Sequence, residues 1–188
     1  RSTLFPYTTL FRSTNMETAA KAFVKGEVAN TDEALQGARD IIAERVNENE
    51  RSRQTVRRSF ECTGMIRSKV VKGKEAEAGK FRDYFDWSEP LKRCTSHRLL
   101  AMRRGEAEGY LRVSISPSDD DDCISRVERG YVKAGTPAAA QVEMAIADAY
   151  KRLLKPSIET EFAGASKGKA DEEAIHVFAN NLKQLLLA

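Results

Sequence analysis

The stretch TDEALQGARDIIAERVNE, residues 31–48, decides the fold class, because its apolar residues recur at steps of three and four. They are Leu35, Ala38, Ile42 and Val46. This spacing lines one face of an α-helix with apolar side chains. Thr31 is the expected N-cap, since acidic residues follow it in the first turn, where the helix dipole favours negative charge. The stretch therefore predicts a helix that buries one face against a core.

The same helical period continues on both sides of this stretch. Further helices are expected over residues 17–28, 51–60, 80–86, 96–105 and 136–155, and a last one carries Ile175, Phe178, Leu182 and Leu185 on one face. Gly105 is expected to end one helix, Pro156 to break another, and residues 164–168 to form a loop of small residues. Only residues 110–115 alternate apolar and polar side chains as a strand does. The prediction is a mainly α fold, a multihelical bundle with at most one short β element near residues 110–115.

Composition places the chain among globular proteins. Of its 188 residues, 41% are hydrophobic and 31% are charged, and no apolar run approaches the roughly 18 residues of a membrane span. The three cysteines, Cys62, Cys94 and Cys123, form no Cys-x-x-Cys pair, which disfavours a zinc site. An odd number of thiols suits a reducing compartment, so a cytoplasmic protein is expected. No cofactor is expected either.

The first residues differ in character from the rest. RSTLFPYTTLFRS, residues 1–13, has Arg-Ser at both ends and repeats Thr-Leu-Phe, without the pattern of a signal peptide or a helix. We interpret residues 1–15 as a foreign, adapter-derived segment, with a natural amphipathic arm as the alternative. Residues 16–188 are then one helical region, which we expect to be truncated, because the last helix is still running at Ala188.

Basic residues concentrate in two acid-poor stretches. Between Arg51 and Lys74 eight bases accompany one acid, Glu61, and residues 91–105 hold five bases and no acid. Lysine and arginine at such density can neutralise nucleic-acid phosphates, although the usual fate of a charge run is a solvated helix face. The candidate nucleic-acid-binding residues are Arg57, Arg58, Lys69, Lys72, Lys74, Arg98, Arg103 and Arg104. No base-reading motif accompanies them, so contacts independent of sequence are expected.

Catalysis has little support in the residue inventory. His97 and His176 are the only histidines, and a structural role is favoured for both. No common nucleotide-binding, hydrolase or metalloprotease motif occurs. An enzyme would need a pocket that joins His97 to an acid such as Asp83 or Glu89. The acidic run 119–122 lacks the glycine and glutamate of a calcium-binding loop, so a solvated loop is expected there and no metal site.

Several segments resemble the Tex family of transcription accessory proteins, in the family's order. They include KGKEAEAGKFRDYFD (72–86), SHRLLA (96–101), RGEAEG (104–109), DAYKRLL (148–154) and AIHVFANNL (174–182). EALQGARDIIAE (33–44) fits as well, whereas Thr95 stands where the family usually has proline and Cys94 where an aliphatic residue is usual.

The resemblance implies a multidomain cytoplasmic protein with helical N-terminal and central regions, an RNase H-like domain, helix-hairpin-helix elements and a C-terminal S1 domain that binds RNA. No catalytic residue of the family falls on this chain. RNA or DNA is the expected partner of the full-length protein, and the transcription machinery is a further one. The chain is then a non-catalytic scaffold that adds phosphate contacts. The alternative is a purely structural or protein-interaction module.

Overall fold

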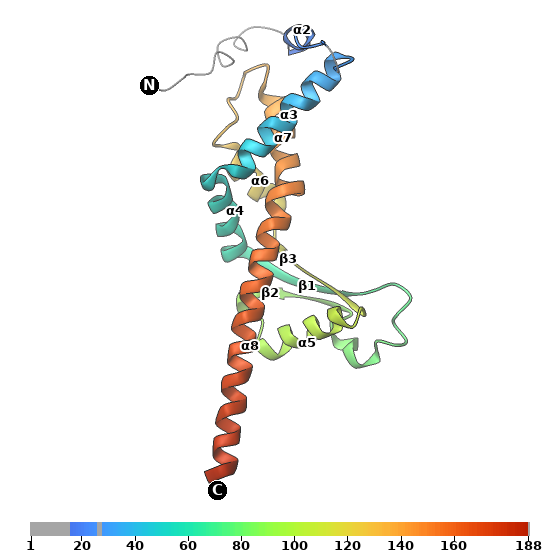
Figure 1. Ribbon diagram of the computed structural model, residues 1–188, viewed down its shortest axis with the longest axis vertical. Coiled ribbons are helices and arrows are strands. Elements are labelled where there is room, and N and C mark those ends of the chain that lie inside the picture. The colour runs from blue at the N-terminus through green and yellow to red at the C-terminus, as the bar shows by residue number, and fades with distance from the viewer. Residues whose placement is uncertain (1–15, 26–27, 188) are drawn as a thin grey trace. The chain divides into compact units, whose positions relative to one another are not determined.

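The computed structural model describes residues 16–25 and 28–187, so the predicted adapter segment lies outside the described residues. The chain divides into two compact units. Unit 1 comprises residues 1–56 and 121–155, and unit 2 comprises residues 57–120 and 156–188. Each unit therefore combines two segments that lie far apart in the sequence (Figure 1).

Unit 1 is helical in its described part. Its elements are α2 (Met16–Lys21), α3 (Thr31–Glu48), the first half of α4 (Glu50–Thr63), most of α6 (Asp120–Glu128), α7 (Ala139–Ala149) and the π-helical turn η3 (Tyr150–Leu154). The helix predicted from residues 31–48 is confirmed. It packs along α7, and Val46 and Ile146 are fully buried, as are the Tyr150 and Leu154 side chains of η3.

The start of α3 lies one residue earlier than predicted. Asn30, not Thr31, is the N-cap, and its side-chain oxygen accepts a hydrogen bond from the Glu33 amide at 2.9 Å. The Glu33 carboxylate in turn accepts the amide of Ala29 at 2.7 Å. The arrangement is similar to a capping box, with the return bond one residue before the N-cap, and asparagine serves as N-cap as well as threonine.

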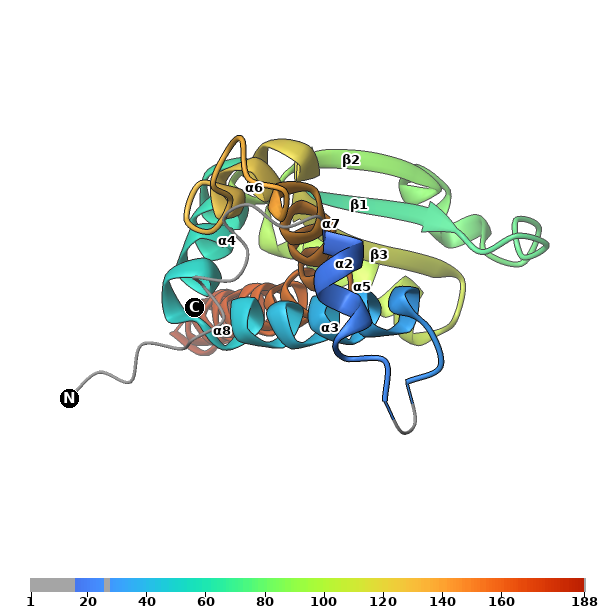
Figure 2. The same ribbon diagram turned by 90° about the horizontal axis from the view of Figure 1, so that it is seen from above.

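Unit 2 is a small antiparallel sheet with helices around it. Its strands are β1 (Gly64–Val70), β2 (Asp86–Pro90) and β3 (Leu111–Pro117), in the order β2–β1–β3 (Figure 2). The helical elements are the second half of α4, η1 (Gly79–Tyr84), η2 (Leu91–Arg93), α5 (Ser96–Ala107) and α8 (Lys155–Leu187). α4 passes directly into β1 at Gly64. Only glycine fits at this position, because a Cβ there would lie 2.2 Å from the carbonyl oxygen of Phe60.

One face of the sheet packs against α5. The alternate β3 residues Leu111, Val113 and Ile115 are buried on this face. Ile66 of β1, the cross-strand partner of Ile115, is buried beside them. From α5, Leu99 and Met102 complete this layer, in which side chains from strand and helix exclude water together. The layer forms the core of unit 2.

The mainly α prediction is confirmed, and so is the strand near residues 110–115. The expectation of at most one β element is wrong, because β1 and β2 pair with β3 in one sheet. The positions of β1 that face away from the core carry Arg67 and Lys69, whose charges made the segment look like a solvated surface rather than a strand. β2 has only five residues and ends in Pro90, so its intrinsic strand preference is weak, and pairing with β1 supplies the missing stability.

Three predicted helix breaks are also wrong. Gly105 lies inside α5, and Gly109, with φ of +76°, follows the helix end. Pro156 does not end the helical run, because it directly follows the π-helical turn η3, where the backbone hydrogen bonds already depart from the α-helical pattern that proline would interrupt. The predicted loop at residues 164–168 is part of α8, since glycine in a helix costs only about 1 kcal/mol relative to alanine. The acidic run is helical from Asp120, as the first turn of α6.

Two carboxylates cover the free edge of β3. The amide of Val113 donates to Glu106 Oε1 of α5 at 3.2 Å, and the amide of Ile115 donates to Glu159 Oε1 of α8 at 2.8 Å. Pro117, at the end of the strand, has no amide hydrogen to satisfy. Because unpaired edge amides recruit other strands, these contacts both anchor the two helices and block extension of the sheet.

Candidate nucleic-acid interface

All eight predicted bases lie in unit 2. Arg57 and Arg58 belong to α4, Lys69 to β1, Lys72 and Lys74 to the loop after β1, and Arg98, Arg103 and Arg104 to α5. The fold thus gathers both basic stretches of the sequence into the same compact unit. Their side chains nevertheless have different surroundings.

Three of the arginines already face a carboxylate. The ion pairs are Arg57 with Glu161 at 3.0 Å, Arg98 with Glu89 at 3.1 Å and Arg103 with Glu106 at 2.7 Å. A guanidinium in such a pair must exchange one anion for another to hold a phosphate, so the net gain is small. These pairs join α4 to α8, α5 to β2, and successive turns of α5, which gives the three arginines a structural role.

Arg98 is the most constrained of these side chains. Its guanidinium carbon lies 5.5 Å from the centroid of the Trp87 ring, while one nitrogen bonds the Glu89 carboxylate. A cation over an aromatic face gains electrostatic energy from the ring quadrupole. Arg98 therefore fixes the N-terminal half of α5 on β2.

The other predicted bases are more accessible. Arg58, Lys69, Lys72 and Arg104 are exposed, and none of them has a carboxylate within ion-pair distance in the described part of the chain. Lys74 is half-buried, with its Nζ 5.7 Å from the centroid of the Tyr110 ring. The four exposed bases can reach a phosphate without giving up an ion pair.

Two bases outside the predicted set lie on the same sheet. Arg67 of β1 and Arg112 of β3 occupy strand positions whose neighbours in sequence point into the core. The alternation that predicted the strand at residues 110–115 already placed Arg112 on its polar side. Arg67 could be placed only once β1 was known to be a strand.

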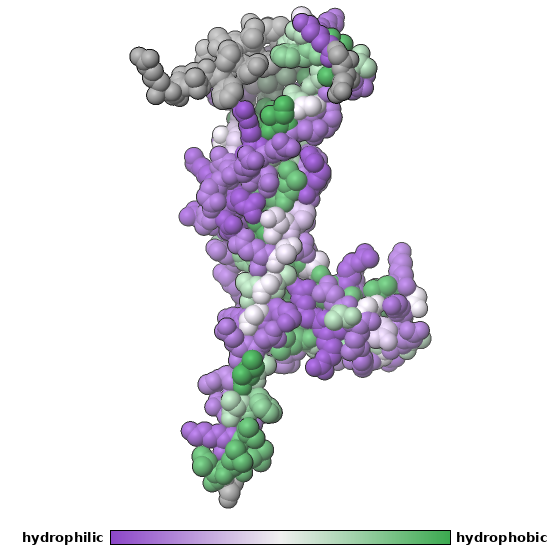
Figure 3. Space-filling view, in the orientation of Figure 1, coloured by the Kyte–Doolittle hydropathy of each residue, from purple (hydrophilic) through white to green (hydrophobic). Residues whose placement is uncertain are grey.

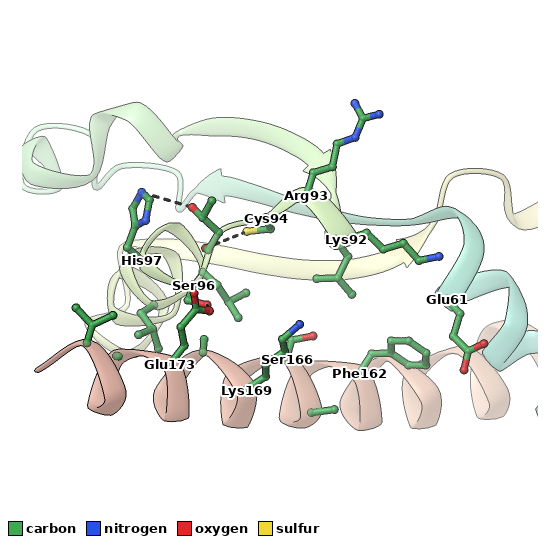
Figure 4. A pocket seen from close by; sticks show the side chains of 18 of the residues that line it. Glu61, Lys92, Arg93, Cys94, Ser96, His97, Phe162, Ser166, Lys169 and Glu173 are labelled. Carbon is green, nitrogen blue, oxygen red and sulfur yellow. Dashed lines mark hydrogen bonds between the residues drawn. The ribbon is translucent and has the colours of Figure 1, made fainter. Parts of the chain in front are cut away.

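A groove in the described part of unit 2 has mostly apolar walls with charged and polar side chains among them. It has a volume of about 1060 Å³ and runs between α8 and the segment from η2 into α5, with Phe60 and Phe162 at one end (Figure 4). His97 is at its rim and its ring turns away from α8, with Nε2 3.4 Å from Thr95 Oγ1. Ser96 Oγ donates to Glu173 rather than to the histidine.

The groove does not join His97 to Asp83 or Glu89, the acids named for an enzymatic pocket. Glu89 bonds Arg98 on the α5 side of the sheet, and Asp83 is exposed on η1. Neither acid lines the groove with His97. Among the described residues that line it, the imidazole contacts one hydroxyl, Thr95 Oγ1 at the long distance of 3.4 Å, and neither a serine nor a cysteine hydrogen-bonds it.

Cys94, which lines the groove, is predicted to be chemically inert. Burial, and then the nearby Glu89 carboxylate, raise the pKa of its thiol from 9.0 to about 12. At pH 8 its thiolate population is therefore about a thousand-fold smaller than that of an ordinary thiol. Alkylation with iodoacetamide, followed by peptide mass spectrometry, should label the exposed Cys62 well before Cys94, and the Cys94 rate should keep rising with pH up to about 12. Equal rates at pH 8 would contradict this.

The described ranges hold neither a cluster of metal ligands nor a membrane span. Within residues 16–25 and 28–187, no three His, Cys, Asp or Glu side chains gather as metal ligands do. No helix in these ranges has the length and apolar character needed to cross a membrane.

Comparison with known proteins identifies the family. The family model described as Tex central region-like matches residues 12–178. The chain belongs to the Tex family. It is 38% identical over 169 residues to Protein tex of Bordetella pertussis, covering 82% of this chain and 21% of that protein. It is 35% identical over 179 residues to Transcriptional accessory protein Tex of Neisseria gonorrhoeae, covering 93% of this chain and 24% of that protein.

A more distant relative carries an RNA-binding name. The S1 RNA-binding domain-containing protein 1 of Pongo abelii is 28% identical over 163 residues, which cover 80% of this Tex-family chain and 16% of that protein. This chain thus spans a quarter or less of the length of each of these three relatives. It corresponds to the central region of Tex-family transcription accessory proteins, and the Neisseria gonorrhoeae relative is named a transcriptional accessory protein.

Proposed function

We propose that this chain is a non-catalytic scaffold in a nucleic-acid-binding transcription accessory protein, and that its exposed bases contact phosphates without reading sequence. The observation that carries the proposal is the group of four exposed bases in unit 2, Arg58, Lys69, Lys72 and Arg104, for which the described residues offer no carboxylate partner. The names of the transcriptional accessory protein of Neisseria gonorrhoeae and of the S1 RNA-binding domain-containing protein of Pongo abelii support the nucleic-acid context. RNA or DNA bound by the full-length protein, the transcription machinery and a cytoplasmic location belong to the same proposal.

Charge removal at the accessible bases tests the proposal. The variant Arg58→Gln/Lys72→Gln/Arg104→Gln should bind a fluorescent single-stranded RNA more weakly, and to the same extent for RNAs of different sequence. Because each phosphate contact to a single strand contributes roughly 0.7 to the slope of log K against log salt, the slope should become shallower by about 2. Anisotropy titrations at several salt concentrations measure both quantities.

A matched control separates position from net charge. Arg82→Gln/Lys169→Gln/Lys183→Gln removes three other exposed charges of unit 2 and should leave the slope nearly unchanged. No binding by the unaltered chain at low salt, or equal effects of the two triple variants, would count against the proposal.

The alternative function is a structural or protein-interaction module. The ion pairs of Arg57, Arg98 and Arg103 favour it, because these arginines bind carboxylates within unit 2 and are not available to a phosphate. On that alternative, Arg57→Gln and Arg98→Gln lower the stability of unit 2, and no basic substitution changes nucleic-acid affinity.

A further inference from the structure

The face of the sheet opposite α5 carries its own set of basic and hydroxyl side chains. On this face Arg67 of β1 lies between Ser88 of β2 and Ser114 of β3. One row along the strand, Lys69 lies between Asp86 and Arg112. We call these six residues the open face. Rows on the same side of a strand are separated by two residues, about 7 Å.

Exposure distinguishes the open face from the face that packs against α5. Lys69, Asp86, Ser88 and Arg112 are exposed, and Arg67 and Ser114 are half-buried, whereas Ile66, Ser68, Val113 and Ile115 are buried on the other side. The surface formed by the sheet and α5 is accordingly mostly hydrophilic in Figure 3. The two sides of the sheet thus differ in kind, one a core layer and the other a polar surface.

The charge pattern of the open face is unfavourable without a ligand. Lys69 and Arg112 are direct cross-strand partners, and side chains in such positions have Cβ atoms about 5 Å apart. Two like charges so placed repel each other. Asp86 offsets one of them from the other side of Lys69, so three bases and one acid leave the six residues with an excess of positive charge. An anion between the rows would relieve the repulsion.

Arg67 is already held in place on this face. Its Nη1 donates to Ser116 Oγ of β3 at 2.5 Å, and Ser116 is buried. The hydroxyls of Ser88 and Ser114 flank it on the two neighbouring strands. The partner of the guanidinium is a neutral hydroxyl and not a carboxylate, so the positive charge of Arg67 is not neutralised. Its other N–H groups remain available to donate hydrogen bonds to an anion. In this respect Arg67 differs from Arg57, Arg98 and Arg103.

We infer that the open face binds the sugar–phosphate backbone of a nucleic acid, with Arg67, Lys69 and Arg112 contacting phosphates and Ser88 and Ser114 donating hydrogen bonds to phosphate oxygens. The strand register presents the bases in two rows, which suits a polyanion with charges at regular intervals rather than one isolated ion. No aromatic side chain occurs among the six residues on which a base could stack, so the contact is to the backbone and independent of sequence. This inference rests on the proposed function and names the surface that carries it.

The test removes the three charges while sparing the bases on α4, α5 and the loop. Arg67→Gln/Lys69→Gln/Arg112→Gln is compared with the Arg82→Gln/Lys169→Gln/Lys183→Gln control in anisotropy titrations. The probes are single-stranded RNA, single-stranded DNA and duplex RNA. We expect the slope of log K against log salt to become shallower by about 2 on a single strand, since each contact contributes roughly 0.7. The control should shift it by less than one contact, and circular dichroism should show both variants folded.

The outcomes separate this inference from the function on which it rests. If the unaltered chain binds none of the three probes at low salt, both fail. If it binds, and the open-face variant keeps the slope of the control while Arg58→Gln/Lys72→Gln/Arg104→Gln lowers it, the open face is not the site but the proposed function stands. A loss of slope in the open-face variant that the control does not show supports the inference, and comparison of the probes then shows which kind of strand is preferred. The double variant Lys69→Gln/Arg112→Gln, which leaves the Arg67–Ser116 contact intact, should show about two-thirds of the change.

Discussion

Gly105→Val should lower the free energy of unfolding of unit 2 by about 3 kcal/mol, the upper range for adding volume to a well-packed core. A Cβ at this position would lie 2.6 Å from Leu111 Cδ1, 2.9 Å from Leu111 Cγ and 3.2 Å from Phe81 Cδ1. Leu111 and Phe81 are both buried, so neither side chain can move away into solvent. The glycine is what allows α5 to approach β3 this closely.

Urea unfolding followed by tryptophan fluorescence measures this effect in the relevant unit, because Trp87 is the only tryptophan and lies on β2. Gly164→Ala is the matched control. Gly164 is exposed on α8, and a Cβ added there would have no neighbouring atom within 4 Å, so alanine should stabilise by up to about 1 kcal/mol through helix propensity. A Gly105→Val variant as stable as the unaltered chain would show that α5 does not pack on β3 in this way.

The helices of unit 1 were predictable because their signal is local. The apolar period of residues 31–48 predicted α3, and the helix predicted over residues 136–155 contains α7, which begins at Ala139. The N-cap was displaced by one residue, because Asn30 and Thr31 both carry a capping oxygen and only the geometry chooses between them.

The sheet of unit 2 was less predictable because its strands depend on one another. β3 has an apolar face that sequence reveals, but β1 and β2 place Ser68 and Trp87 opposite each other on the same buried face. A buried serine and a short proline-ended strand carry little preference of their own. They become strands because β3 and α5 supply a partner and a cover, which no window of a few residues contains.

The side-chain partners of the candidate bases could not be predicted from the sequence. Basic stretches in the sequence identified all eight candidate residues, yet Arg57 finds its partner Glu161 at a separation of 104 residues. Such contacts depend on how α8 returns alongside α4. The same holds for Arg67 and Arg112, which share a sheet face through the β1–β3 register and not through nearness in sequence.

Phe60→Ala should destabilise unit 2 by about 3–5 kcal/mol, the usual cost of truncating a buried phenylalanine. Phe60 is 1% exposed at the end of α4, and its ring centroid lies 5.3 Å from that of Phe162 on α8, with the planes inclined by 37°. The substitution removes both the buried apolar area and this aromatic contact. Tryptophan fluorescence during urea unfolding again reports the change.

Phe178→Ala provides the matched control, because it makes the same chemical change on α8 at a side chain that is 67% exposed. Its effect should stay within about 0.5 kcal/mol, as for most surface substitutions. Similar losses at the two positions would mean that the C-terminal half of α8, where Figure 3 shows a hydrophobic surface, is packed in solution. A large loss at Phe60 alone would show that the contact between α4 and α8 contributes strongly to the stability of unit 2. The ion pair of Arg57 with Glu161 joins the same two helices and depends on the same contact.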